Sequence, residues 1–121
     1  MSNILVVAIA ENEGFYESNL VSQGHVDKAS TPEEAIKFLE SGHHDFVISE
    51  FDLGERARRN GIGILLAAKK IDPNVVAVLI LDEDIKTEYV KKKIDYFFDK
   101  PVGIDQLQET VQLFIEDKTA G

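Results

Sequence analysis

The residues best suited to chemistry are carboxylates that follow short apolar segments. They are Glu11, Glu50, Asp52, Asp82, Glu83 and Asp84. One lysine, Lys100, follows a further apolar segment and precedes Pro101. Clustered carboxylates bind Mg²⁺ through oxygen ligands, and a lysine beside them can hold a phosphoryl group as a point charge. The alternative is that these residues are polar only because loops at strand ends are exposed.

Other catalytic patterns are missing. The sequence has no cysteine, which excludes disulfides, thiolate zinc sites and cysteine nucleophiles. The Gly-Ile-Gly at 61–63 lacks the rest of a dinucleotide-binding fingerprint, and Ser49 has no nucleophile elbow around it. His43 and His44 are adjacent in a turn, where neighbouring side chains point apart. We therefore expect a solvated turn there and not a joint metal site.

Short apolar segments predict the strands that position these residues. The segments lie at 4–10, 46–48, 75–81 and 96–98, with a weaker one at 25–29. Continuous hydrophobicity, without alternation, is typical of strands that are buried on both faces, as in a parallel sheet. The weaker segment is expected at an edge of that sheet.

Amphipathic segments alternate with the strands and predict helices. Thr31 and Glu34 match a capping box, Pro32 suits the first helical position, and Gly42 ends that helix. The clearest apolar stripe has spacings of three, four and three residues; it consists of Ile104, Leu107, Val111 and Phe114. The other helices are predicted at 12–23, around 62–66 and at 84–93.

This alternation of strand and helix, five times over, predicts an α/β fold. We expect a flavodoxin-like (βα)5 three-layer sandwich with a parallel five-stranded sheet in the order 2-1-3-4-5. One domain would span residues 1–121, with a frayed tail from about Asp117. In such folds the site lies at the carboxyl ends of the strands, so the carboxylates listed above are expected to converge.

Charge and hydropathy exclude several kinds of partner. The chain has 13 Lys and Arg against 22 Asp and Glu, a net charge of −9. Such a surface repels nucleic acid backbones and anionic membranes. The longest apolar runs have seven residues, which is too short to span a bilayer. No basic segment precedes the first run, so we expect a cytoplasmic domain without a secretion signal.

Several stretches, taken in order, resemble the receiver domain of response regulators (CheY-like). Residues 4–7 are similar to the first strand of that family. Residues 33–39 and 45–50 resemble its second helix and third strand, and residues 95–101 resemble its fifth strand with the Lys-Pro ending. Two short turn motifs support the register, at 60–62 and 72–74.

The resemblance implies a site with altered chemistry. Receiver domains transfer a phosphoryl group from a histidine kinase to their own aspartate, with Mg²⁺ held by an acidic pair. The pair falls on Ala8 and Ile9, which cannot bind a metal, and the acceptor position falls on Glu50. Glu11 lies two positions beyond the pair. We therefore expect no metal; if one binds, Glu11, Glu50 and Asp52 are the candidate ligands.

The remaining positions of the family are only partly retained. The position of the Ser or Thr falls on Leu81, or on Asp82 if the register slips by one residue. The lysine is retained as Lys100, and the switch aromatic is Phe97. Glu50 is expected to pair with Lys100 in a structural role, the alternative being a mimic of the active state.

The resemblance thus implies a degenerate receiver, or pseudo-receiver, that is not an enzyme and needs no cofactor. It would act in two-component signalling as a protein-interaction module that does not depend on phosphorylation. Its partner would be a histidine kinase, an output domain or another regulator, with a homodimer also possible. The interaction surface would include Tyr89, Phe97, Phe98 and Leu107.

Two other functions stay open. In one, the domain is phosphorylated at Asp52, with Mg²⁺ held by Glu11 and Asp82. In the other, it is a flavodoxin-like protein that binds a small ligand, although no sequence feature names that ligand.

Overall fold

The computed structural model describes residues 2–53, 60–81, 94–99 and 103–120, except for the side chains of 60, 99, 104 and 116–120. The helix predicted at 84–93 lies outside these residues. The described elements follow one another in the order β1 (Ser2–Val7), α1 (Ala10–Leu20), β2 (Gly24–Ala29), α2 (Pro32–Ser41), β3 (Phe46–Glu50), α3 (Asn60–Ile71), β4 (Val76–Leu81), β5 (Tyr96–Asp99) and α5 (Ile104–Ala120).

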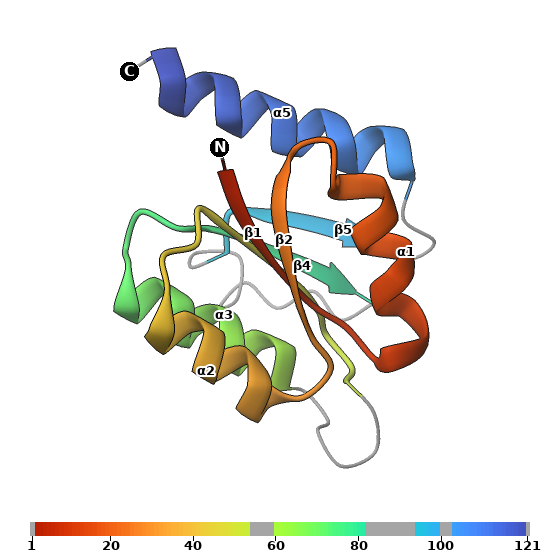
Figure 1. The fold of residues 1–121 in the computed structure, drawn as a ribbon, viewed down its shortest axis with the longest axis vertical. Coiled ribbons are helices and arrows are strands. Elements are labelled where there is room, and N and C mark those ends of the chain that lie inside the picture. Colours follow the sequence, from red (N-terminus) through yellow and green to blue (C-terminus); the bar gives the residue numbers. More distant parts are fainter. Residues whose placement is uncertain (1, 54–59, 82–93, 100–102, 121) are drawn as a thin grey trace.

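The five strands form one parallel sheet in the order β2-β1-β3-β4-β5. Helices α2 and α3 lie side by side on one face, and α1 and α5 cover the other (Figure 1). The predicted fold class, strand order and edge position of the weak strand are confirmed.

Burial on both faces explains why the strands are continuously apolar. Successive side chains of a strand point to opposite faces. In β1, Leu5 and Val7 pack into the core beneath α2 and α3, whereas Ile4 and Val6 pack into the core beneath α1 and α5. The same division runs through β3 and β4. We call these the α2/α3 core and the α1/α5 core.

The start of α2 shows how local sequence fixes a boundary. The Thr31 hydroxyl accepts the Glu34 N–H at 3.2 Å, as the capping box predicts. Glu34 reaches back and accepts the Ser30 N–H and hydroxyl at 3.3 and 3.0 Å. These hydrogen bonds from Ser30 lower the pKa of Glu34. The capping hydrogen bonds therefore link the end of β2 to the first turn of α2.

Several boundaries differ from the sequence prediction; α1, for example, ends at Leu20 instead of residue 23. The first strand ends at Val7 instead of residue 10, because Ala10 already begins α1. At the other end, α5 extends to Ala120 and includes the segment from Asp117, whose fraying stays a prediction. Among the described residues, no helix combines the length and apolar character needed to cross a membrane.

Candidate functional site

The carboxyl end of β3 carries a fully buried carboxylate, Glu50, whose exposed fraction is 0%. The two-residue period of the strand places Glu50 on the same face as Ile48, which belongs to the α1/α5 core. Its cross-strand neighbour on β4, Ile80, belongs to the same core. Glu50 therefore faces α1.

Three donors from α1 and its N-cap residue bind the Glu50 carboxylate. The Ile9 N–H donates to Oε1 at 3.0 Å. The Asn12 side-chain amide and the Tyr16 hydroxyl donate to Oε2 at 2.9 and 3.2 Å. Ile9 is the N-cap residue of α1 and offers no side-chain cap of its own. Glu50 thus satisfies a donor at the helix start, where the helix dipole also favours a negative charge.

Sequence reasoning found Glu50 but missed Asn12 and Tyr16. These two residues are four positions apart, so they lie on one face of α1, and Leu20 continues that face into the core. A polar residue, a tyrosine and a leucine at this spacing form the only sequence signal that pointed to the network.

Helix α3 approaches the same point from the other side. A β-carbon on Gly61 would lie 2.1 Å from the Glu50 carbonyl oxygen and 3.0 Å from the Phe51 Cα atom. Only glycine fits there, since real side chains do not come so close. The Gly61 motif therefore lets α3 begin directly against the end of β3.

The described residues at the predicted metal site offer a poor ligand set for Mg²⁺. Ala8 and Ile9 have hydrocarbon side chains, which offer no oxygen ligand. Ala8 is also buried, and Ile9 occupies the N-cap position of α1. Glu11 is exposed in the first turn of α1; Asn12, and not Glu11, reaches Glu50. Both Glu50 oxygens already accept hydrogen bonds. The described residues contain no group of three or more histidines or carboxylates that could hold a metal ion.

Two further predicted positions can be placed. Asp52 is exposed between the buried residues Phe51 and Leu53, just past the end of β3. Leu81 ends β4 and is buried in the α2/α3 core. It offers no hydroxyl to a ligand at the strand ends.

Several predicted residues lie outside the part of the chain that the structure describes. They are Asp82, Glu83, Asp84, Tyr89 and Lys100, so the predicted pairing of Glu50 with Lys100 is not described either.

The predicted interaction surface needs a correction. Phe98 and Leu107 are 7% and 0% exposed, because both pack into the α1/α5 core. Phe97 is partly buried against the α2/α3 core. The large apolar side chains exposed on this face are instead Tyr96 and Leu113, at 42% and 66%.

An open groove of about 420 Å³ is lined by residues of β5 and α5. Its lining includes Tyr96 and Phe98 from β5, together with Gln106, Glu109 and Leu113 from α5. We call it the β5–α5 groove.

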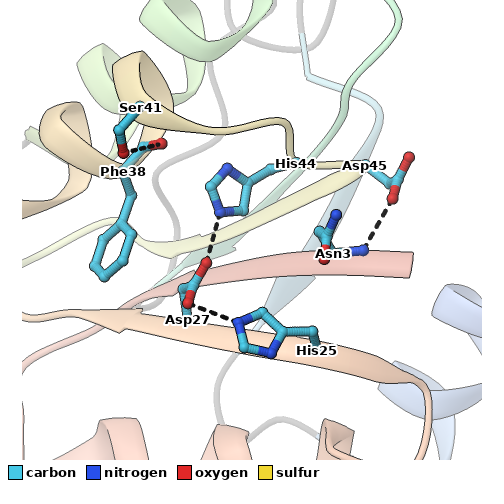
Figure 2. Close-up of polar contacts among 7 residues, drawn as sticks. All are labelled: Asn3, His25, Asp27, Phe38, Ser41, His44 and Asp45. Carbon is cyan, nitrogen blue, oxygen red and sulfur yellow. Dashed lines mark hydrogen bonds and ion pairs between the residues drawn. The ribbon is translucent and has the colours of Figure 1, made fainter. Parts of the chain in front are cut away.

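A second polar cluster lies at the edge of the sheet, around Asp27 of β2 (Figure 2). Asp27 accepts hydrogen bonds from His25 and His44, with Nε2 to oxygen distances of 3.0 and 2.9 Å. Burial raises the pKa of Asp27, but the hydrogen bonds and charges of His44 and His25 outweigh this, so that the pKa lies below its ordinary value.

The prediction of a solvated histidine turn was half wrong. The His43 side chain is 66% exposed, whereas that of His44 is only 4% exposed. His44 points back under the end of α2 towards β2 (Figure 2), and its ring meets that of Phe38 edge to face, with the centroids 6.3 Å apart. Its Nδ1 atom is buried and has no hydrogen-bond partner within the described segments.

Comparison with known proteins identifies the fold. No protein-family model matches the sequence, and no curated protein matches it significantly. Solved structures do match. A response-regulator receiver domain protein from Clostridium thermocellum has a TM-score of 0.82 at 23% identity, over 99% of this chain and 98% of that chain. The response regulator TrrA from Thermotoga maritima, solved with Mg²⁺ and BeF, has a TM-score of 0.81 at 24% identity, over 94% and 99% of the two chains.

The chain has the fold of response-regulator receiver domains. The same fold extends to a structure described as adenylate cyclase from Rhodopirellula baltica, with a TM-score of 0.82 at 16% identity, covering 95% of this chain and 87% of that one. The resemblance noted in the sequence is therefore confirmed at the level of the receiver fold. In this receiver fold, the carboxyl end of β3 carries a buried glutamate that is bound to α1.

Proposed function

We propose that this domain is a pseudo-receiver, which binds a signalling protein without being phosphorylated on an aspartate. The observation that carries the proposal is the Glu50 network. The residue expected at the acceptor position has both carboxylate oxygens occupied by donors from α1. A nucleophilic oxygen must instead be free to face the incoming phosphorus.

The electrostatics of the site support the same proposal. Phosphoryl transfer depends on metal ions that neutralise the charge developing on the phosphoryl oxygens. Ala8 and Ile9 bring no carboxylate to the position where the family holds its metal, and Leu81 brings no hydroxyl. We therefore propose that the domain has neither enzymatic self-phosphorylation nor a Mg²⁺ cofactor.

The proposed role is that of a binding module in two-component signalling. Its partner would be a histidine kinase, an output domain or another regulator. The surface available for this role is the face of β5 and α5, where Tyr96 and Leu113 expose apolar area.

The test is incubation of the purified protein with acetyl phosphate and Mg²⁺, followed by intact-mass spectrometry. We expect no mass increase of one phosphoryl group, while TrrA treated in parallel serves as the comparison. Asp52→Asn is the diagnostic variant, because Asp52 is the exposed carboxylate next to β3. Labelling of the wild type that disappears in Asp52→Asn would replace the proposal with a receiver whose acceptor is Asp52.

A further inference from the structure

We propose that His43, when protonated, bridges Asp45 and Asp72 and thereby links the amino ends of β1, β3 and β4. We call these three residues the His43 bridge. The bridge makes the stability of this end of the sheet depend on pH. It lies at the end of the sheet opposite Glu50, so the inference is independent of the proposed function.

Asp45 is held in place by the backbone around it. It directly precedes β3; its N–H donates to the Asn3 carbonyl oxygen at 2.8 Å, and its carbonyl oxygen accepts the Val76 N–H at 2.9 Å. Its side-chain Oδ2 atom accepts the Asn3 N–H at 2.9 Å (Figure 2). The Asp45 carboxylate therefore joins the starts of β1 and β3, while its Oδ1 atom lies 3.3 Å from Nε2 of His43.

Asp72 is held in a similar way at the turn between α3 and β4. Its N–H donates to the Ala68 carbonyl oxygen at 2.9 Å, and its carbonyl oxygen accepts the Val75 N–H at 3.0 Å. Its Oδ1 atom accepts the Asn74 N–H at 2.9 Å, and its Oδ2 atom lies 3.7 Å from Nδ1 of His43. Each carboxylate of the bridge thus has one oxygen bound by a backbone N–H and the other beside the same imidazole ring.

The two ring nitrogens of His43 each face a carboxylate, which only the protonated ring can satisfy. An ionised carboxylate accepts hydrogen bonds and donates none, and a neutral imidazole carries a single N–H. Whichever nitrogen lacks the proton presents a lone pair to a negatively charged oxygen. The imidazolium has an N–H at both positions and a positive charge between two negative ones. The folded protein therefore favours the protonated ring more than the unfolded chain does.

The neighbouring charged groups leave this role to His43. Of the two lysines in the last turn of α3, Lys69 pairs with Asp95 at 2.6 Å, and Lys70 forms no ion pair among the described residues. Within the same part of the chain, His43 is the only ion-pair partner of Asp72.

The other two histidines need no second proton. His25 and His44 each face one carboxylate, that of Asp27, through Nε2. A neutral ring with its proton on Nε2 can donate that hydrogen bond. In His44 the second nitrogen is buried without a hydrogen-bond partner in the described segments, so a proton there would find no acceptor among them.

The order of the two carboxylates makes the bridge effective. An exposed ion pair is weak partly because two flexible side chains must lose conformational freedom. Here backbone hydrogen bonds already hold both carboxylates, so only the ring of His43 has to be ordered. The side chain of His43 is 66% exposed, and screening by solvent keeps the effect within the range of surface pairs.

The experiment compares urea unfolding of the wild type and His43→Gln between pH 8 and pH 5.5. Glutamine keeps a neutral donor at this position and cannot be protonated. A histidine in an unfolded chain titrates near about pH 6.5, so the contribution of the bridge is complete below that pH and is lost as the pH rises above it. The folding equilibrium constant of the wild type, divided by that of His43→Gln, should rise about two- to fivefold as the pH falls. High salt should reduce the rise.

A second measurement reports on the bridge itself. The Asn74 amide donates to Asp72, so its hydrogen-exchange protection factor should increase at low pH in the wild type. The same protection factor should stay constant in His43→Gln.

Three matched variants separate the bridge from the acidic surface in general. Asp72→Asn keeps an oxygen acceptor for the Asn74 N–H but removes the charge, and in this background most of the rise should disappear. Glu33→Gln removes an exposed carboxylate in the first turn of α2, at the other end of the sheet, and should preserve the rise. His25→Gln removes a histidine that is similarly exposed, at 60%, but faces one carboxylate; its effect should depend less on pH.

Several results would overturn the inference. A ratio of folding constants that stays constant or falls on acidification would show that the protonated ring is not favoured. A rise that persists in full in Asp72→Asn would exclude the second carboxylate. An equal rise for His25→Gln, or its loss in Glu33→Gln, would assign the effect to the net charge of −9 instead of the bridge.

Discussion

Glu50 and Asp27 are two carboxylates held on opposite faces of the same sheet. Glu50 lies at the end of a central strand, faces the α1/α5 core and accepts a backbone N–H, an amide and a hydroxyl. Asp27 lies in the edge strand opposite Leu5, faces the α2/α3 side and accepts two imidazoles. Within the described residues, the donors identified on Glu50 are uncharged groups, whereas those identified on Asp27 are two histidine rings.

The two carboxylates therefore have different roles within one receiver fold. The position where the resemblance expects chemistry holds a group that joins β3 to α1. The acidic group with titratable partners instead lies at the sheet edge, where the resemblance expects nothing. We infer that Glu50 has a framework role, which means that it stabilises the fold by joining β3 to α1. The predictions below test whether Glu50 and Asp27 differ in this way.

Removing the Glu50 side chain should have the largest effect. Glu50→Ala leaves the Ile9 N–H, the Asn12 amide and the Tyr16 hydroxyl without their acceptor. A buried donor left unsatisfied costs about 1–3 kcal/mol; the Tyr16 bond is buried, the Ile9 and Asn12 bonds are partly buried, and relief of the buried carboxylate offsets part of the cost. We expect the free energy of unfolding in urea to fall by about 3 kcal/mol.

Two controls sharpen this prediction. Glu40→Ala, on the exposed face of α2, should change stability by less than about 0.5 kcal/mol. Formate, compared with chloride at equal ionic strength, should stabilise Glu50→Ala but not the wild type, because it can refill the vacated acceptor position. Equal stability of the Ala variants at 40 and 50 would contradict a framework role.

The close approach of α3 to β3 should give the next largest effect. Gly61→Ala forces a β-carbon against the Glu50 carbonyl oxygen, and should cost about 1–3 kcal/mol. Gly63 is two residues further along the same helix, and a β-carbon there meets no atom within 4 Å. Gly63→Ala should therefore stabilise the protein by about 0.5–1 kcal/mol. Effects of the same sign, measured by thermal unfolding, would refute the close contact.

Loss of a single donor should have a smaller effect. Tyr16→Phe removes the hydroxyl that donates to Glu50 and should cost about 1 kcal/mol. In the Glu50→Ala background the same change should cost less, because the partner is already gone. A double-mutant cycle in urea measures this coupling, and strict additivity would show that the two side chains act independently.

The hydrogen bonds of Asp27 should make the free energy of unfolding depend on pH. The pKa of Asp27 is lower in the folded state than its ordinary value in an unfolded chain, so the unfolded state binds more protons as the pH falls through this range. The stabilisation is therefore complete above about pH 4 to 5 and is lost as the pH falls through the folded pKa. Wild type and Asp27→Asn should converge in stability at low pH and diverge above it.

Urea midpoints collected between pH 2 and pH 6 would measure this difference. At neutral pH we expect Asp27→Asn to cost about 1 kcal/mol, the smallest of these effects. A constant difference between the two proteins at all pH values would mean that the imidazoles do not favour the ionised carboxylate.

The fold could be predicted because its signals are local. Unbroken apolar segments indicated strands buried on both faces, and Thr31 with Glu34 marked the start of a helix. The position of Glu50 followed from the same pattern, since polar residues at strand ends meet at one edge of a parallel sheet.

The partners of the two carboxylates could not be predicted in the same way. The contacts of Glu50 with Asn12 and Tyr16 span 38 and 34 residues, and helix α1 carries polar residues on most of its surface. His44 is buried where it contacts Phe38 and Asp27, and Asp27 is 17 residues away in the sequence. Such contacts depend on how helices and strands pack against one another. The local sequence pattern carries no information about this packing. For the same reason Phe98 and Leu107 looked available in sequence, although packing of α5 on the sheet covers them.

An NMR titration with Mg²⁺, and then with Mg²⁺ and beryllofluoride, tests the central claim most directly. If Glu50 is part of the framework, the amide signals of Ile9, Asn12, Glu50 and Phe97 should not shift saturably, under conditions in which those of TrrA do. Saturable shifts at residues 50–52 that extend to Phe97 would contradict the account, because they would show a site that still accepts a metal and a phosphoryl mimic.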